Sequence, residues 1–94
     1  MLAKKLPTKA DKAWFAACHE LGCAVCGKMT ELETHHVTGA GMGLRSAHTD
    51  SFSLCHFHHR TGGYGHAVHA GTKEWEKRYG SQTEILERVR TELA

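Results

Sequence analysis

The sequence predicts a small α+β domain, in which helices at both ends enclose a middle part with two short strands. Three observations lead to this prediction. Apolar residues recur at helical spacing near each end, two short stretches of the middle are typical of strands, and all nine histidines lie between residues 19 and 69. A chain of 94 residues suffices for one domain with a small core. Domains of this size often need disulfides or a structural metal ion.

The first helix is predicted over residues 8–21. Thr8 followed by Asp11 resembles a capping box at its start, and Gly22 is a plausible end. Five residues at helical spacing share one face: Ala10, Trp14, Ala17, Cys18 and Leu21. Cys18 on this apolar face is interpreted as a small buried hydrophobic residue rather than a ligand.

Residues 1–7 are polar or basic, end at Pro7 and are expected to form a flexible basic N-terminus. The domain itself is predicted to span residues 8–94. Residues 1–12 hold four lysines and one aspartate, although the whole chain has a formal charge of only +2. A basic arm suits a phosphate backbone, so Lys9 and Lys12 are candidate DNA contacts. A solvated tail explains the arm equally well.

Cys23 and Cys26 form a C-x-x-C motif that is followed by Gly27. This pattern is typical of a zinc knuckle, whose turn aims both thiolates at one ion. A thioredoxin-like redox pair would need a βαβ pattern around it, which the sequence lacks. Cys55 and His58 repeat the spacing downstream. Together the four residues predict a tetrahedral Cys₃His zinc site of structural type.

The compartment is expected to be the cytoplasm. The N-terminus has no apolar run typical of a signal peptide, and no later run is long enough to cross a membrane. Disulfides are rare in the cytosol, so the four cysteines are expected to bind metal or to remain free thiols.

Residues 34–37 are predicted to form a short strand and residues 50–54 a second one. Neighbouring strand residues point to opposite faces, so His35 and His36 can take different roles. The connection over residues 38–49 is rich in glycine but lacks the ending of a Walker loop. Arg45 in this connection is a candidate contact to a phosphate backbone, and an ordinary hairpin loop is the alternative.

The stretch from Cys55 to His69 reads CHFHHRTGGYGHAVH. A helix is predicted to start near residues 56–59 and to be interrupted by the glycines. Thr72 is expected to cap a helix that runs to Tyr79. Ser81 with Glu84 predicts a second capping box, which begins a last helix with an apolar face. That face carries four residues: Ile85, Leu86, Val89 and Leu93.

The order of these motifs resembles the HNH (ββα-metal) endonucleases. C-x-x-C is followed by His-His on a strand, a glycine-bearing loop, a second strand and then Leu-Cys-x-x-His-His. Within that superfamily, THHVTGAGMG, SLCHFHHRTGGYG and HAGTKEWEKRYGSQTEIL are most similar to the phage-encoded Ref-type nucleases. The resemblance covers residues 8–94. It implies a zinc-stapled ββα-metal domain with flanking N-terminal and C-terminal helices, which cuts DNA in partnership with RecA filaments during phage or prophage recombination.

The resemblance also implies two metal centres. Structural zinc would be held by Cys23, Cys26, Cys55 and His58. A catalytic divalent ion, Mg²⁺ or Mn²⁺ with Zn²⁺ as a further option, would be held by His35 and His59. The family's usual third position falls on Gly63 here, so His66, His69 or water would complete the set. His69 is favoured because it lies in the shared HAG segment.

Three further roles follow from the same resemblance. His36 would be the general base, and Arg60 would contact DNA. Asp50 stands where the family usually has asparagine and would be catalytic, by orienting the base or binding metal, with a structural role as the alternative. The chemistry suits these roles, because a neutral imidazole can take a proton from water at pH 7 and a divalent cation stabilises the charge on the phosphate.

The expected function is therefore a metal-dependent DNA endonuclease, nickase-like, with a histidine base. The alternative is a non-catalytic zinc-stapled module that binds DNA or a protein. Such a module needs the Cys₃His set only and leaves the remaining histidines unexplained. A zinc hydrolase acting on small molecules is disfavoured, because the H-E-x-x-H motif is missing.

Overall fold

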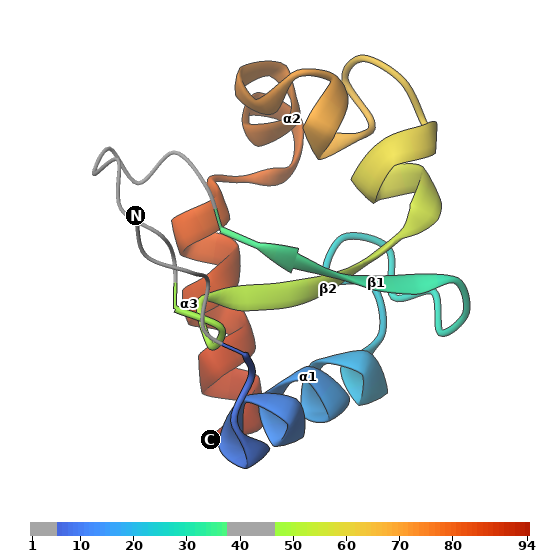
Figure 1. Cartoon of the computed structure of the whole chain (residues 1–94). Helices are drawn as coiled ribbons and strands as arrows, with labels where there is room; N and C mark the ends of the chain where they lie inside the picture. Colours follow the sequence, from blue (N-terminus) through green and yellow to red (C-terminus); the bar gives the residue numbers. More distant parts are fainter. Residues whose placement is uncertain (1–5, 38–46) are drawn as a thin grey trace, which may run out of the picture.

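A computed structural model describes residues 6–37 and 47–94 and has a small mixed α+β fold. The predicted N-terminus 1–7 and glycine-bearing connection 38–49 therefore lie largely outside the described residues, and Arg45 lies wholly outside them. An antiparallel hairpin forms the centre, with helix α1 along one side and helix α2 beyond the opposite side (Figure 1). Among the described residues, no helix is long and apolar enough to cross a membrane.

Helix α1 spans Lys9–Leu21 and confirms the predicted capping box. The hydroxyl of Thr8 accepts a hydrogen bond from the backbone N–H of Asp11, and the Asp11 carboxylate accepts one from the backbone N–H of Thr8. Cys18 is 3% exposed and lies in the apolar core, as predicted. Trp14 anchors the helix to the sheet, because its indole N–H donates to the backbone oxygen of Ser51 at 3.0 Å.

The two strands are shifted from their predicted positions. Strand β1 spans Leu32–His36 and pairs with strand β2, Ser51–Cys55, in the register Leu32 opposite Cys55. β1 begins two residues earlier than predicted because Leu32 and Glu33 pair with the end of β2. The pairing was not predicted, because the residues around Leu32 and Glu33 in the sequence are mostly polar. The strand therefore includes the carboxylate of Glu33, which lies outside the predicted strand.

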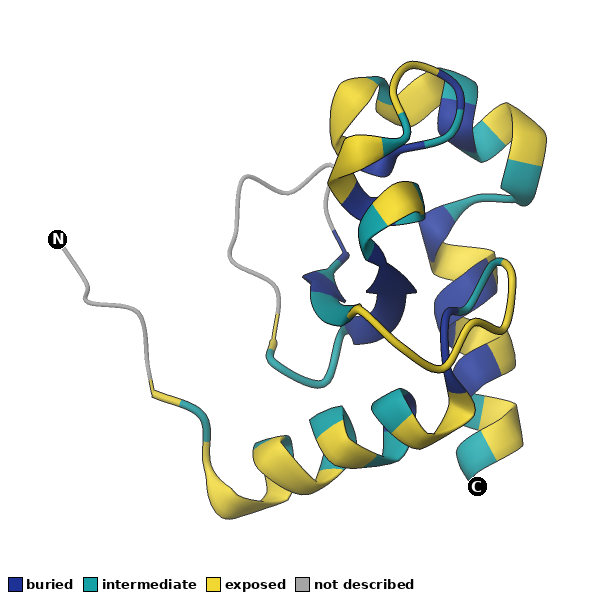
Figure 2. Ribbon diagram, turned by 90° about the vertical axis from the view of Figure 1, so that its right-hand side faces the viewer, coloured by how far each residue is buried: buried dark blue, intermediate teal, exposed yellow. Residues whose placement is uncertain are grey.

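Every residue of β2 is buried, since α1, α3 and the turn after the strand all pack against it. Figure 2 shows strand β2 in dark blue, between helices whose outer surfaces are largely exposed. The core combines the strand with residues from the later helices, and its largest fully buried apolar side chains are Phe52, Leu54, Val68 and Trp75. The chain thus buries the strand that carries Cys55 and so holds that thiol in place.

Two short turns follow the hairpin. A π-helical turn, η1, spans Phe57–Thr61, and a 3₁₀ turn, η2, spans Val68–Ala70. The backbone N–H of Gly62 donates to the oxygen of Phe57, which is the five-residue spacing of a π-turn. A helical start at this point was predicted, whereas its π geometry and the second turn were not.

The last two helices occupy the predicted ranges. Helix α2 spans Thr72–Tyr79 and helix α3 spans Gln82–Leu93. The Ser81–Glu84 capping box is confirmed. The predicted cap at Thr72 is wrong, because Gly71 occupies the capping position and the Thr72 hydroxyl donates back to the oxygen of Val68.

Candidate metal centres

The described residues bring Cys23, Cys26, Cys55 and His58 into one group whose ligand atoms all lie within 4.8 Å of one another. The Cys26 and Cys55 sulfurs are 3.9 Å apart. Nδ1 of His58 lies 3.4 Å from the Cys55 sulfur and 3.8 Å from the Cys23 sulfur. Tetrahedral zinc would separate two sulfurs by about 3.8 Å and a sulfur from a nitrogen by about 3.5 Å. The group could therefore hold a metal such as zinc.

The turn that carries the first two thiols depends on glycine. Gly22 and Gly27 both have positive φ, and a Cβ on Gly22 would come within 2.9 Å of two backbone oxygens. The backbone N–H of Gly27 donates to the oxygen of Cys23 at 2.8 Å and closes the turn. The N–H of Ala24 donates to the oxygen of Ser53, which ties the turn to β2. Local sequence therefore shapes the knuckle, and the sheet positions it.

The Cys23 thiol is prepared for metal binding by its surroundings. Burial acts to raise its pKa, but hydrogen bonds from the backbone at Cys55, Cys26 and Val25 outweigh burial and lower the pKa below the usual value. The N–H of Val25 donates to the Cys23 sulfur at 3.4 Å. The thiolate is the form that binds metal, so this arrangement favours the ligand state.

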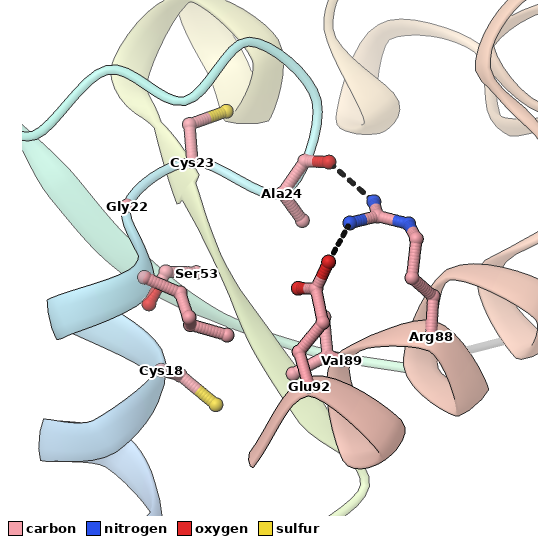
Figure 3. A pocket seen from close by; sticks show the side chains of 9 residues that line it. Cys18, Gly22, Cys23, Ala24, Ser53, Arg88, Val89 and Glu92 are labelled. Atoms are coloured by element: carbon pink, nitrogen blue, oxygen red, sulfur yellow. Dashed lines mark hydrogen bonds and ion pairs between the residues drawn. The ribbon is translucent and has the colours of Figure 1, made fainter.

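Arg88 braces the knuckle from helix α3 (Figure 3). Its guanidinium donates to the backbone oxygen of Ala24 at 2.5 Å and lies 3.6 Å from the Glu92 carboxylate. The same side chains line a small pocket that Cys18 and Cys23 also border. The last helix therefore holds the turn through a long-range contact that no sequence motif predicts.

We expect Arg88→Ala to lower the free energy of unfolding by about 1 kcal/mol. The substitution removes one charge-assisted hydrogen bond to the knuckle, from a side chain that is 48% exposed. Thermal unfolding and the rate of zinc transfer to a chelator would measure the effect. Lys77→Ala is the matched control, since Lys77 is an exposed cation on α2 whose ion pair is with Glu74 of the same helix. Equal zinc release from both variants would contradict the bracing role.

A second group consists of three imidazoles. His35 comes from β1, His59 from η1 and His69 from η2, and their ligand atoms also lie within 4.8 Å of one another. Nε2 of His59 is 3.0 Å from Nε2 of His69, and the His35 ring centre lies 5.2 and 5.3 Å from the other two. Nitrogens at this separation can share one ion, because metal–nitrogen bonds of about 2.1 Å place neighbouring ligands about 3.0–3.4 Å apart.

Burial favours the neutral, metal-binding state of two of these imidazoles, those of His35 and His69. It lowers the pKa of His35 to about 4, against the raising effect of a hydrogen bond with Gln82. Burial also lowers the pKa of His69, and His59 adds to this effect. Both rings are therefore neutral at pH 7 and keep a nitrogen lone pair for a cation.

The π-turn explains how consecutive histidines serve different groups. His58 turns its Nδ1 to the sulfurs of the knuckle, whereas His59 turns its Nε2 to His69. Consecutive residues of a helical turn point in different directions around its axis. The single turn η1 thus joins the Cys₃His group to the imidazole group.

Two residues that contact the second group were missed by the sequence analysis. Oε1 of Glu33 lies 2.6 Å from Nδ1 of His59, and Oε1 of Gln82 lies 2.8 Å from Nε2 of His35. The hydrogen bond with His59, more than any other contact, lowers the pKa of Glu33 to about 2. Glu33 stands two residues before His35, so strand alternation could have placed both on one face. Nothing local marks Gln82, which lies on α3.

Of the two alternatives for the third imidazole, the structure brings His69 to the group and not His66. Nδ1 of His66 instead lies 3.1 Å from the hydroxyl of Tyr79. The sequence analysis favoured His69 but kept His66 as the alternative, because both residues are close to His59 in the chain. The fold separates them through the turn η2, which carries His69.

The two predicted catalytic residues lie outside both groups among residues 6–37 and 47–94. His36 points to the face of β1 opposite His35, where its Nε2 lies 3.1 Å from Nδ1 of His48 and its ring contacts Phe15 edge-on. The Asp50 carboxylate forms an ion pair of 2.5 Å with Arg90 on α3. These contacts give Asp50 a structural partner, and its catalytic role stays a prediction.

The described residues that were predicted to contact DNA differ in whether they form an ion pair within the protein. Lys9 and Lys12 are exposed on α1. Arg60 is also exposed, but its guanidinium is paired with the Glu33 carboxylate through two nitrogens. Arg60 is therefore paired with Glu33, the residue that contacts His59 of the second group.

Comparisons with known proteins place the chain in a family but assign no activity. No curated protein and no solved structure matches it. A family model described as "Protein of unknown function (DUF968)" matches residues 1–93. Because this match covers nearly the whole chain, the protein belongs to the DUF968 family.

Proposed function

We propose that this protein is a metal-dependent DNA endonuclease of the HNH (ββα-metal) type, which hydrolyses one phosphodiester bond at a time. The observation that carries the proposal is the convergence of His35, His59 and His69 beside a separate Cys₃His group. A fold that only needed a metal staple would have no use for the second group. Two sets of ligands on so small a chain support one structural ion and one catalytic ion.

The arrangement of the elements also supports the proposal. An antiparallel hairpin is followed directly by a helical turn, and the turn supplies a ligand to each group. The first strand contributes His35 to the imidazole group. This order of strand, strand and helical turn corresponds to the ββα-metal pattern that the sequence motifs resemble.

In this mechanism, a divalent ion held by His35, His59 and His69 would supply Lewis acidity to the scissile phosphate. His36 is the proposed base that takes a proton from the attacking water. Its ring is oriented by the contact with His48 and by the edge of Phe15. A base that is held in one orientation loses less entropy when it meets its substrate.

DNA is the proposed partner, and its backbone would meet the exposed lysines of α1, Lys9 and Lys12. Arg60 would contribute only if a phosphate competed with Glu33 for its guanidinium. A RecA filament is a further proposed partner, which rests on the Ref-like resemblance alone. The proposed setting is the cytoplasm of a bacterial host.

A non-catalytic zinc module is the second candidate, and two contacts favour it. Asp50, which was predicted to be catalytic, and Arg60, which was predicted to contact DNA, both form ion pairs within the protein. Such a module would bind DNA or a protein through the zinc-stapled surface without cutting. It leaves the three converging imidazoles without a role, which is why we favour the enzyme.

Incubation of the purified, zinc-loaded protein with supercoiled plasmid tests the proposal. We expect nicked circles with Mg²⁺ or Mn²⁺ and none with a chelator that removes these ions but leaves the tightly bound zinc. Parallel reactions with and without RecA filaments would reveal a filament requirement. Intact plasmid under every metal condition, with RecA present, would refute the nuclease and favour the binding module.

A further inference from the structure

Glu33 makes the closest contact to an imidazole of the second group. We propose that Glu33 is a positioning residue, which fixes the tautomer and orientation of His59 so that its Nε2 faces the ion. This inference rests on the proposed function for the identity of the second ion. The assignment of the hydrogen bond itself depends only on the chemistry of the two side chains.

The direction of the hydrogen bond follows from the carboxylate. An ionised carboxylate can only accept hydrogen bonds. Nδ1 of His59 lies 2.6 Å from Oε1 of Glu33, so Nδ1 must carry the proton in that contact. In a neutral ring the lone pair then resides on Nε2. That atom lies 3.0 Å from Nε2 of His69 and points into the imidazole group.

Glu33 is itself held from several sides, as a positioning residue needs to be. Arg60 binds its carboxylate through Nε at 3.0 Å and through a second nitrogen. Nε2 of His56 lies 3.2 Å from Oε2. The backbone of Glu33 is paired with Leu54 in the sheet. The carboxylate therefore has little freedom to turn away from His59.

The same contacts keep Glu33 from acting as a ligand. Its two oxygens already serve His59, His56 and Arg60, and its charge is balanced by the Arg60 guanidinium. A carboxylate hydrogen-bonded to a metal-binding histidine typically raises the basicity of that ring and orients it. Arg60, which the sequence suggested as a DNA contact, thus has a second use as the support of Glu33.

Gln82 contacts His35 in a similar position, yet it does not determine the tautomer. An amide offers both an acceptor oxygen and a donor nitrogen, so either nitrogen of the His35 ring could carry the proton. Glu33 is the sharper test, because its chemistry allows one assignment only. The prediction therefore concerns His59.

The test compares Glu33→Gln and Glu33→Ala with Glu31→Gln, a control that changes a neighbouring exposed glutamate paired with Lys28. Long-range ¹H–¹⁵N NMR of the zinc-loaded protein, before a second ion is added, reads the His59 tautomer. We expect the Nδ1–H form in the natural protein and in the Glu31 variant. In Glu33→Ala the ring should lose this preference, and Glu33→Gln should retain part of it.

Calorimetric titration of the same zinc-loaded proteins with Mn²⁺ gives the second measurement. We expect Glu33→Ala to lower the affinity for Mn²⁺ about 10- to 100-fold, with a smaller loss for Glu33→Gln. The Glu31 control should bind as the natural protein does. A purely structural role for Glu33 would lower stability without changing the tautomer.

An unchanged His59 tautomer and unchanged Mn²⁺ affinity in both Glu33 variants would overturn the inference, whatever the plasmid assay shows. Conversely, a shifted tautomer and weaker Mn²⁺ binding in a protein that never nicks DNA would uphold the positioning role and refute the nuclease. If Glu33→Ala fails to fold, both measurements are made on Glu33→Gln, since this substitution keeps the shape of the side chain.

Discussion

Replacement of Cys26 by alanine is expected to unfold the domain. Cys26 is exposed, so its truncation removes almost no buried surface, and any large loss must come from the missing ligand. Structural zinc typically contributes about 10–16 kcal/mol of binding free energy to folding, whereas a small domain has only about 5–15 kcal/mol of net stability. Circular dichroism and zinc content per chain would measure the loss.

Cys18→Ala is the matched control for this experiment. Cys18 is a buried thiol outside the Cys₃His group, with a pKa raised to about 11 by burial. Removal of this thiol should lower the free energy of unfolding by about 1 kcal/mol through lost packing, and should leave one zinc ion bound. A folded, zinc-free Cys26→Ala protein would refute the structural zinc site.

His36→Ala is expected to have the largest effect on the proposed activity. Loss of a general base typically slows a reaction by a factor of about 10²–10⁴. Because His36 lies outside the three-imidazole group, the variant should still bind zinc and Mn²⁺ as the natural protein does. Time courses of plasmid nicking, with Mn²⁺ affinity measured on the same preparation, separate the loss of the base from the loss of an ion.

His19→Ala controls for the removal of an imidazole from the same side of the molecule. His19 is a half-buried residue of α1, and its Nε2 lies 3.3 Å from the hydroxyl of Thr34 on β1. We expect it to nick plasmid at nearly the natural rate. Equal activity of His36→Ala and His19→Ala would rule out His36 as the base.

Local motifs explain why most elements could be predicted. The capping boxes at Thr8 and Ser81 act between residues three apart, and the helices begin where they predict. The strands were shifted by one or two residues, because pairing across the hairpin rather than hydrophobic pattern sets their ends. The turn η2 has no such motif, and no local pattern indicated it.

The candidate ligands could also be predicted from the sequence and its resemblance to a known family. The spacing of Cys23 with Cys26, and of Cys55 with His58, belongs to short turns that aim two side chains at one point. Strand alternation separated His35 from His36. The structure brings each of the predicted ligand sets into a group, which is compatible with both proposed ions.

By itself, the sequence determined the α-helices, the two strands and the candidate Cys₃His set, because these depend on spacings of a few residues. The candidate set of His35, His59 and His69 came instead from the resemblance to the HNH endonucleases. Only the tertiary structure decided the partners around those ligands. The contact between His59 and Glu33 spans 26 residues, and that between His35 and Gln82 spans 47. Such contacts arise from the packing of α3 and η1 on the sheet, and no periodicity along the chain encodes them.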